Sequence, residues 1–473
     1  MLFSSVTFLY WFLPLTLAAY FVTPMPGGTT RWRNLVLLSA SLVFYAWGEP
    51  LYVALMVAEI AALWGIGLTI ARATAVRIKR CWVAVACVVA IGVLGYFKYA
   101  DFFISSFNQA FGLGIPLLRI ALPIGISFYT FQMLSYIFDL AAGRTEVQRN
   151  VLSFATYVVL FPQLVAGPIV RYSAVADQLT TRSHTLQRFA DGATRFTVGL
   201  AKKVLIANTI AELAAVMAET DERTFTSAWL WVLAFSLQLY FDFSGYSDMA
   251  IGIGTMLGFD FPENFNYPYI AASITDFWRR WHMSLSSWFR DYVYIPLGGS
   301  RVKPVRHFVN IFAVWGLTGF WHGADWRFIA WGLYFGAVLV AEKYAFGGRL
   351  LRLPGVIAHV YSLILVAIGW VLFETEGFGN AAGLVGRMFG VGVDGLAGQE
   401  SLYYLRSYAV LLLLGVLGAT PLPRRIGEWV AAWRVGGFTP VSVLRPVGMA
   451  LLLLLVTAFL VDGSFNPFIY FRF

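Results

Sequence analysis

The sequence contains few charged residues and almost no cysteine. Only 12% of its 473 residues are Asp, Glu, Lys or Arg, whereas a soluble globular domain has about 25%. Hydrophobic residues make up 59% of the chain, and the mean hydropathy is +0.71. This composition excludes a disordered chain, which lacks apolar residues, and a soluble fold would leave much apolar surface facing water. The sequence therefore predicts a polytopic membrane protein.

The two cysteines, Cys81 and Cys87, lie in one apolar segment. Their spacing rotates the side chains by about 240° around a helix, so they point in different directions. The sequence therefore predicts neither a disulfide framework nor a metal site. The N-terminus lacks the basic residues of a signal peptide, so we interpret the apolar run from Thr7 to Val22 as an uncleaved first span. The net charge of +9 indicates basic cytosolic loops rather than nucleic-acid binding.

Apolar segments long enough to cross a membrane recur along the whole chain. A spanning helix needs about 20 mostly apolar residues, so the sequence predicts an all-α polytopic membrane helical bundle of about 11–12 spans. We expect one domain, 1–473, because a helical bundle in lipid uses this length without internal boundaries. The predicted spans are residues 6–23, 34–47, 51–70, 81–97, 122–140, 204–218, 229–257, 308–321, 326–345, 354–373, 407–420 and 446–461.

The apolar segment 153–170 differs from the predicted spans. It is interrupted by Phe161-Pro162-Gln163 and by Gly167-Pro168, so we expect it to enter the membrane and turn back as a re-entrant segment. Broken backbone at that depth is tolerated only where it is buried in protein or lines a wet cavity. The segment is therefore a candidate wall of a site.

The stretches between the predicted spans differ in charge. Acidic residues predominate in 219–223 and 374–406. If 153–170 is re-entrant, strict alternation of the spans places both acidic stretches outside and every basic stretch in the cytosol, as the positive-inside rule requires. The basic stretches are 71–80, 276–306, 343–352 and 424–445.

Polar residues also occur within apolar sequence. The predicted span 229–257 contains a polar block that includes Asp242, and ionisable residues at membrane depth are costly and usually functional. The following stretch, 262–301, is too polar to span but rich in aromatic residues. Helical periodicity from Ser273 predicts an amphipathic helix that places arginines at the membrane interface. The alternative interpretation is that this helix only anchors the protein at the interface and takes no part in a site. The arginines are Arg279, Arg280 and Arg290.

Two of the five histidines are candidate site residues. His184 and His307 lie in basic loops and His359 begins a span, so we expect none of these to be catalytic. His282 lies in the aromatic and basic stretch, and His322 ends an apolar run between nearby glycines. A desolvated histidine stays neutral near pH 7 and can accept a proton as a general base. The alternative is a hydrogen-bonded structural histidine, and this pattern alone names no reaction.

Several long runs of the sequence form specific motifs. They are YFDFSGYSDMAIGIGTMLGF at 240–259, ENFNYPYI at 263–270, FWRRWHMSLSSWFRDYVYIPLGG at 277–299 and GFWHGADWRFIAWG at 319–332. Further runs are the N-terminal MLFSSVTFLYWFLP and FPQLVAGPIVR at 161–171. Together these runs extend over most of the chain and resemble the membrane-bound O-acyltransferase family, and within it the bacterial alginate O-acetylase membrane subunits.

The resemblance implies that His322 is the essential histidine and His282 the second histidine of the site. It implies acetyl-CoA as a cytosolic acyl donor, with no bound cofactor. Guanidinium groups suit its phosphates, so Arg279, Arg280 and Arg290 are expected to contact them. The other two residues expected to bind substrate are Asp242 and Trp321. The alternative for the three arginines is anchoring at the membrane surface.

The expected function is O-acetylation of an exported polysaccharide, alginate in the first place, at the bacterial inner membrane. Some relatives carry a further histidine where this chain has Tyr334 and Phe335, so cellulose and peptidoglycan stay open as acceptors. The chain has no GxSxG motif and no soluble domain. We therefore expect a periplasmic or membrane-tethered polysaccharide acetyltransferase subunit as partner. A transporter or flippase is the alternative class, and it would not require His322.

Overall fold

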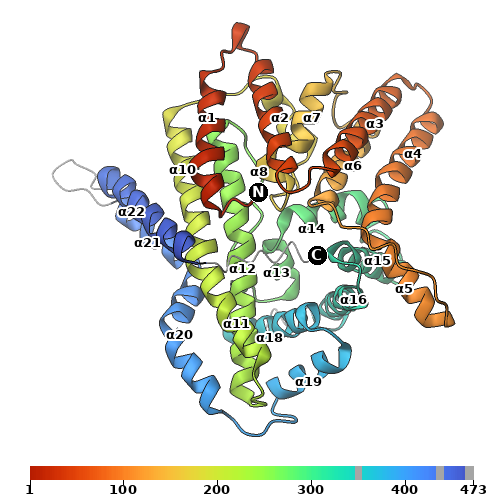
Figure 1. Cartoon of the computed structure of the whole chain (residues 1–473). Coiled ribbons are helices and arrows are strands. Elements are labelled where there is room, and N and C mark those ends of the chain that lie inside the picture. The colour runs from red at the N-terminus through yellow and green to blue at the C-terminus, as the bar shows by residue number, and fades with distance from the viewer. Residues whose placement is uncertain (347–353, 433–440, 464–473) are drawn as a thin grey trace. The chain divides into compact units, whose positions relative to one another are not determined.

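The computed structural model describes residues 1–346, 354–432 and 441–463, and this part of the chain is built from helices (Figure 1). Outside the helices it contains one isolated bridge, between Thr224 and Gly395, in the described ranges. The predicted all-α class is therefore confirmed. The predicted basic stretches 343–352 and 424–445 lie partly outside the described residues.

The described residues form two compact units, so the expectation of one domain over 1–473 stays a prediction. The first unit comprises Met1–Phe196 and Ser247–Glu263, and the second comprises Thr197–Tyr246 and Asn264–Phe473. Two of the three boundaries along the chain fall inside long helices, α10 (Leu186–Ala201) and α12 (Phe225–Met256), and the third lies between Glu263 and Asn264, outside the helices. The other helices of the first unit are α1 (Leu13–Val22), α2 (Arg31–Ala46), α3 (Tyr52–Arg72), α4 (Val76–Leu94), α5 (Ala100–Phe111), α6 (Ile126–Ala141), α7 (Val151–Val159), α8 (Phe161–Leu164) and α9 (Tyr172–Val175).

The second unit contains both candidate histidines. Aromatic side chains from α12 to α18 form its buried core, which includes Trp281, Trp331 and Trp370. The other helices of this unit are α11 (Thr209–Glu219), α13 (Ile274–Arg280), α14 (Met283–Phe289), α15 (Pro304–His322), α16 (Trp326–Ala341), α18 (Gly355–Glu374), α19 (Phe378–Met388), α20 (Gln399–Gly418), α21 (Leu422–Ala432) and α22 (Val441–Asp462).

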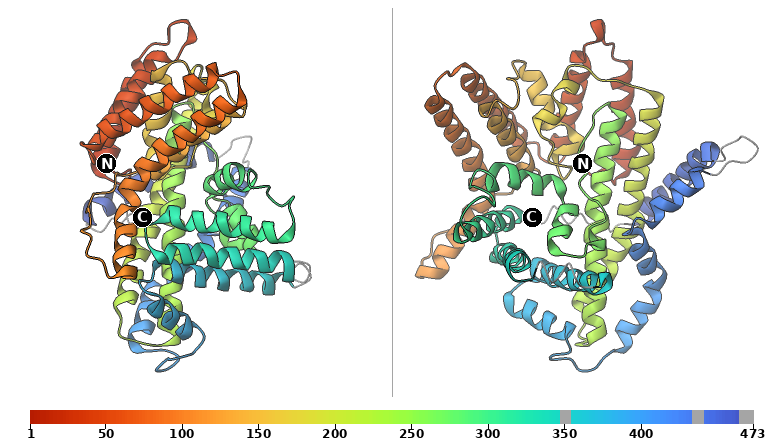
Figure 2. Two further views of the ribbon diagram at one scale, coloured as in Figure 1. Left: turned by 90° about the vertical axis from the view of Figure 1, so that its right-hand side faces the viewer. Right: turned by 180° about the vertical axis from the view of Figure 1, so that it is seen from behind.

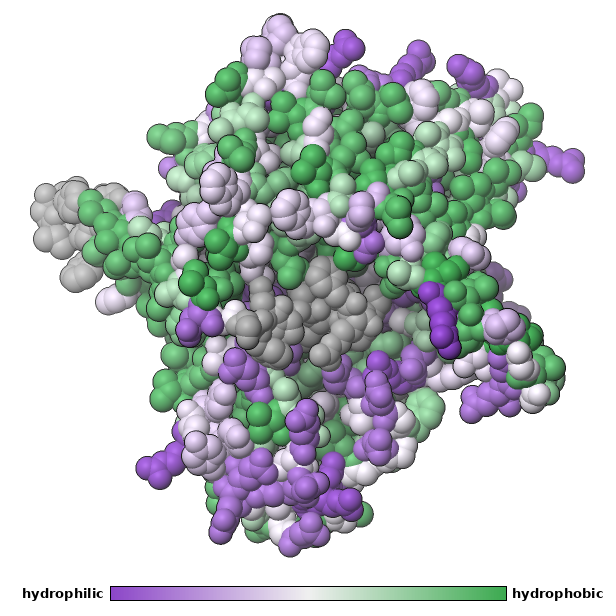
Figure 3. Space-filling view, in the orientation of Figure 1, coloured by the Kyte–Doolittle hydropathy of each residue, from purple (hydrophilic) through white to green (hydrophobic). Residues whose placement is uncertain are grey.

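Six helical stretches in the described ranges are long and apolar enough to cross a membrane. Each overlaps a predicted span, although Val76–Phe111 is much longer than the predicted 81–97 and Gln399–Gly418 begins before the predicted 407–420, and together they make the chain a multi-pass membrane protein. The remaining predicted spans are also helical, but they are shorter or carry more polar residues. Figure 3 shows apolar side chains over much of the visible surface and hydrophilic ones where α11 ends and α12 begins. The six stretches are Tyr52–Arg72, Val76–Phe111, Trp326–Phe346, Gly355–Glu374, Gln399–Gly418 and Val443–Asp462.

The predicted break in 153–170 is present. Helix α7 ends at Val159, Leu160 has a non-helical ψ of 110°, and α8 covers only the residues up to Leu164. Pro162 and Gln163 are buried, so the protein shields this irregular backbone, as its place in an apolar segment requires. The segment belongs to the first unit.

The stretch predicted to form one amphipathic helix from Ser273 is divided. Ser273 is the N-cap of α13, and its Oγ accepts a hydrogen bond from the backbone N–H of Asp276 at 3.0 Å. The helix ends at Arg280, and α14 begins two residues after Trp281. The start of the helix was therefore predicted correctly, whereas its continuation through His282 was wrong.

Helices α15 and α16 run side by side (Figure 2), and glycines allow them to approach closely. A Cβ atom at Gly319 would lie 2.1 Å from the carbonyl oxygen of Phe328, and one at Gly332 would lie 2.1 Å from that of Trp315. Small residues commonly permit such close contact between membrane helices. This packing fixes the C-terminal end of α15, where His322 lies.

Candidate active site

His282 and His322 line one cavity of about 790 Å³ in the second unit. Its wall also includes the basic side chains of Arg279, Arg290 and Lys343. We call it the histidine cavity. Its size falls within the range of about 300–1,000 Å³ that is usual for small-molecule sites. The structure thus brings together both histidines and two of the three arginines predicted from the sequence.

His322 is held among aromatic rings at the end of α15. Its side chain is buried, and its ring lies edge-on to its neighbours, with centroid distances of 5.0 Å to Trp321, 5.1 Å to Trp331 and 5.4 Å to Phe373. Trp321 is also 5.9 Å from the ring of His282. These stiff neighbours restrict the imidazole to one orientation, which a group that transfers protons requires.

Asn264 fixes the tautomer of His282. The Nδ1 atom of His282 lies 3.1 Å from Oδ1 of Asn264, and the same oxygen accepts hydrogen bonds from the backbone N–H and the hydroxyl of Ser284 at 3.3 and 2.9 Å. A backbone N–H can only donate, so the atom facing His282 is the amide oxygen, and Nδ1 must carry the proton. The lone pair of neutral His282 is therefore on Nε2.

The backbone of His282 has an unusual conformation. Its φ of 44° and ψ of 54° are left-handed, which costs a residue with a Cβ about 1–2 kcal/mol. Together with the extended backbone of Trp281, this residue separates α13 from α14, and strain of this kind often occurs at functional sites. Burial lowers the pKa of His282 well below its ordinary value, and the nearby His322 lowers it further. His282 is therefore neutral at pH 7.

A buried carboxylate positions α13. Glu342 follows α16, is 4% exposed, and accepts hydrogen bonds from the backbone N–H groups of Ile274 and Thr275 at 2.6 and 2.9 Å. The hydroxyl of Thr275 donates to the same carboxylate at 2.7 Å. These N–H groups begin α13 and have no partner within the helix, so Glu342 anchors the helix that carries Arg279.

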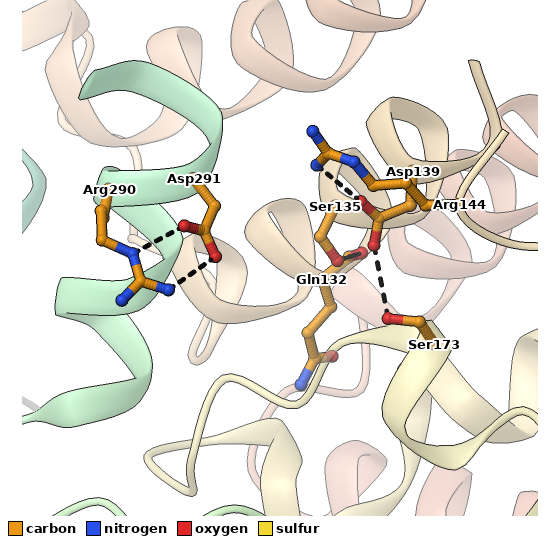
Figure 4. A network of polar contacts seen from close by, with 7 residues as sticks. All are labelled: Gln132, Ser135, Asp139, Arg144, Ser173, Arg290 and Asp291. Carbon is orange, nitrogen blue, oxygen red and sulfur yellow. Dashed lines mark hydrogen bonds and ion pairs between the residues drawn. The ribbon is translucent and has the colours of Figure 1, made fainter. Parts of the chain in front are cut away.

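The three predicted arginines have different surroundings. Arg279 is exposed in the wall of the histidine cavity. Arg290 also lines the cavity and forms an ion pair with Asp291, at 2.7 Å between Nε and Oδ1 (Figure 4). Arg280 is paired with Asp276 on α13 at 2.9 Å and is not part of the cavity wall. Arg279 is thus best placed to contact an anionic ligand in this cavity.

The other two predicted substrate-binding residues do not line the histidine cavity. Trp321 packs between the two histidine rings. Asp242 on α12 forms an ion pair with Lys203, at 2.7 Å between Nζ and Oδ1, and both side chains are at most 3% exposed. Lys203 also donates to Oδ1 of Asn208 at 2.9 Å. Substrate binding by Trp321 and Asp242 stays a prediction.

Comparison with known proteins shows which sequences this chain resembles. The sequence pattern of the membrane-bound O-acyltransferase family matches residues 146–354, a range that contains both histidines and every lining residue named above. Over its whole length the chain is 40% identical to the whole of the probable alginate O-acetylase AlgI of Pseudomonas putida. The chain belongs to the membrane-bound O-acyltransferase family. It is therefore a membrane enzyme that transfers acyl groups to oxygen.

Two further relatives are similar to this chain over most of their length. The probable alginate O-acetylase AlgI of Azotobacter vinelandii is 46% identical over 83% of this chain and 79% of that protein. The peptidoglycan O-acetyltransferase of Helicobacter pylori is 34% identical over 89% of this chain and 86% of that protein. Members of one family with this degree of similarity thus have names that refer to different polymers.

Sequence reasoning did not find several residues that shape the site. Asn264 lies in the quoted ENFNYPYI run, and Glu342 lies at the end of a predicted span, but their partners are distant in sequence. His307 was expected in a basic loop, whereas its ring is buried between the hydroxyls of Tyr294 and Tyr344 at 2.7 and 2.6 Å. Only three-dimensional proximity identifies these contacts.

The role of Asn264 can be tested through pH dependence. In Asn264→Asp, the carboxylate would face Nδ1 of His282, and an adjacent opposite charge raises the pKa of an imidazole. If transfer requires neutral His282, activity is lost as the pH falls from about 8 to 5.5 and His282 gains a proton. Because the pKa of His282 is raised in Asn264→Asp, this variant should lose activity at a higher pH than the wild type does. The pH profile of acyl transfer measures this shift, with Asn264→Ala expected to lose activity at every pH. If Asn264→Asp and the wild type lose activity at the same low pH, the proposed role of Asn264 beside His282 is contradicted.

Proposed function

We propose that this enzyme takes acetyl groups from cytosolic acetyl-CoA and delivers them outward across the bacterial inner membrane for O-acetylation of an exported polysaccharide. The observation that carries the proposal is the histidine cavity, in which two buried histidines share one wall with basic side chains. An acyl donor with phosphate groups needs cationic contacts near the reacting carbonyl, and a hydroxyl acceptor needs a base.

The basic side chains support a nucleotide thioester as donor. Arg279 and Lys343 lie in the cavity wall, in stretches whose positive charge predicts a cytosolic position. Acetyl-CoA can then bind from the cytosol without moving its phosphates into lipid, where charge is costly. Only the small, uncharged acetyl group has to reach His322.

His322 is the proposed general base. It removes the proton of the attacking hydroxyl while the oxygen of that hydroxyl forms a bond to the thioester carbon. The tetrahedral adduct then collapses with cleavage of the carbon–sulfur bond, and the leaving thiolate takes the proton from the imidazolium. General base catalysis of this kind typically contributes about 10²–10⁴-fold to the rate.

The tautomer of His282 limits what it can do. Because Nδ1–H donates to Asn264, neutral His282 can only accept a hydrogen bond at Nε2. It can thus orient a substrate N–H or O–H group, whereas stabilisation of an oxyanion by donation would require the imidazolium. The low pKa of His282 makes that form unfavourable. We therefore assign His282 to substrate orientation.

The acceptor polymer is proposed from the relatives. Those with the highest identities above are named probable alginate O-acetylases, so alginate is the first candidate. The relative named peptidoglycan O-acetyltransferase makes peptidoglycan the second. We infer that a periplasmic or membrane-tethered partner completes the transfer, because the longest predicted stretches outside spans, 258–306 and 374–406, are short for a domain that binds an extended polymer.

Reconstitution tests the transfer and the hand-off together. In liposomes that contain the purified chain, radiolabelled acetyl-CoA and alginate alone should give little labelled polymer. Addition of a periplasmic extract from a bacterium that acetylates its alginate should start the labelling. Efficient labelling of alginate by the chain alone would refute the hand-off. Labelling of peptidoglycan fragments in place of alginate would favour the second acceptor, and an inert system with both polymers and extract would contradict the proposed donor.

A further inference from the structure

The second unit contains another large cavity, of about 1010 Å³, whose lining differs in charge from that of the histidine cavity. It lies where α11 ends, α12 begins and α18 meets α19. Its wall contains more carboxylates than guanidinium groups, and we call it the acidic cavity. The charged lining residues are Glu219, Glu222, Glu374, Glu376, Arg223 and Arg387.

The two cavities approach each other at the end of α18. Phe373 is 3% exposed and contacts His322, which lines the histidine cavity. The next two residues, Glu374 and Thr375, line the acidic cavity. Phe373 therefore touches the wall of one cavity, and its own chain continues directly into the wall of the other.

The position of Phe373 is well fixed. Its ring packs against Phe328 at 5.0 Å and Trp331 at 5.2 Å. The following carbonyl, of Glu374, accepts a hydrogen bond from Arg327 at 2.9 Å, which holds the end of α18. A bulky ring held in this way excludes water from the space it fills.

We propose that Phe373 is the barrier between the acidic cavity and the histidine cavity. The acidic cavity is then the entrance for the hydroxyl acceptor, which must displace the Phe373 ring to reach His322. Without an acceptor, the ring keeps the water of the acidic cavity away from the thioester. This assignment of substrates rests on the proposed function, whereas the barrier itself rests on the contacts above. Without the barrier, water would attack the thioester carbon: a carbon–oxygen bond forms, the carbon–sulfur bond breaks, and the products are acetate, a proton and the free thiol.

Cysteine accessibility tests the barrier without any substrate. In a background with Cys81→Ser and Cys87→Ser, Thr318→Cys places a thiol in the histidine cavity, whose wall includes Thr318. A membrane-impermeant cationic methanethiosulfonate, applied from the face on which the acidic cavity opens, should leave this thiol unmodified. With Phe373→Ala added, the same reagent should modify it.

Phe335→Ala is the matched control, because Phe335 is fully buried in the same aromatic cluster, contacts Trp331 and lines neither cavity. Modification in both variants, or in neither, would overturn the proposal. Phe373→Leu, which keeps most of the bulk, should protect the thiol and shows whether the Ala variant merely misfolds.

If the donor is acetyl-CoA, Phe373→Ala should also hydrolyse it about tenfold faster without acceptor. If Phe373→Ala allows modification of the thiol but does not speed up hydrolysis, the barrier proposal stands and acetyl-CoA is contradicted as the donor.

Discussion

The His322→Ala variant should lose acyl transfer by about 10²–10⁴-fold or more, while it accumulates in the membrane like the wild type. The imidazole lies at the end of α15 in the wall of the histidine cavity, and alanine has no group that can take a proton from a hydroxyl. Transfer to the polymer in membranes from cells that express each variant, together with the amount of folded protein in detergent, measures both effects.

Two variants separate chemistry from packing in this experiment. His322→Gln keeps most of the volume among the surrounding aromatic rings, so it should be as inactive as His322→Ala but at least as stable. His359→Ala removes a histidine whose Nδ1 contacts the carbonyl of Ala271 at 3.2 Å outside the histidine cavity, and it should remain active. Normal polymer acetylation in His322→Gln would rule out His322 as the base.

Much of the fold could be predicted because membrane helices obey local rules. A run of apolar residues of sufficient length must form its hydrogen bonds within one helix, so the six candidate spans could be located from composition alone. The interruption of 153–170 was predictable for the same reason, since Pro162 cannot donate a backbone hydrogen bond. The N-cap at Ser273 is likewise a local signal.

The site could be predicted only in part because its geometry depends on distant residues. His282 and His322 were singled out by their positions in the sequence, and the resemblance to the family assigned their roles. No local pattern indicates the left-handed backbone of His282, because neither glycine nor proline lies beside it. The oxygen of Asn264 holds that histidine from a loop 18 residues earlier. Neighbouring Arg279 and Arg280 look equivalent in sequence, yet helical rotation places only Arg279 in the cavity wall.

The position of Asp242 gives the polar block of α12 a structural purpose. Ionisable residues within apolar helices were interpreted as functional because burial of a lone charge is costly. The ion pair with Lys203 offsets that cost inside the second unit, and neither partner lines the histidine cavity. A charge at membrane depth can thus indicate a second buried charge as well as a substrate.

Loss of the ion pair between Lys203 and Asp242 is expected to have a large effect on the stability of the protein. Lys203→Met should destabilise the protein by about 3–5 kcal/mol, because it leaves the carboxylate of Asp242 buried without its cation. The double variant Lys203→Met/Asp242→Asn removes both charges with little change in shape, so it should recover most of the folded protein. Arg280→Met breaks the more exposed pair with Asp276 and serves as the matched control, with an expected loss of about 0–1 kcal/mol.

Thermal unfolding in detergent, followed by size-exclusion chromatography, ranks these variants, and acyl transfer by the double variant then decides the role of Asp242. If Asp242 acts through the ion pair with Lys203, the folded double variant should transfer acetyl groups at nearly the wild-type rate. A double variant that is folded but inactive would instead support the substrate-binding role predicted from the sequence. Equal stability of Lys203→Met and the wild type would contradict the expected loss. It would mean that the carboxylate of Asp242 becomes protonated or reaches water once its cation is removed.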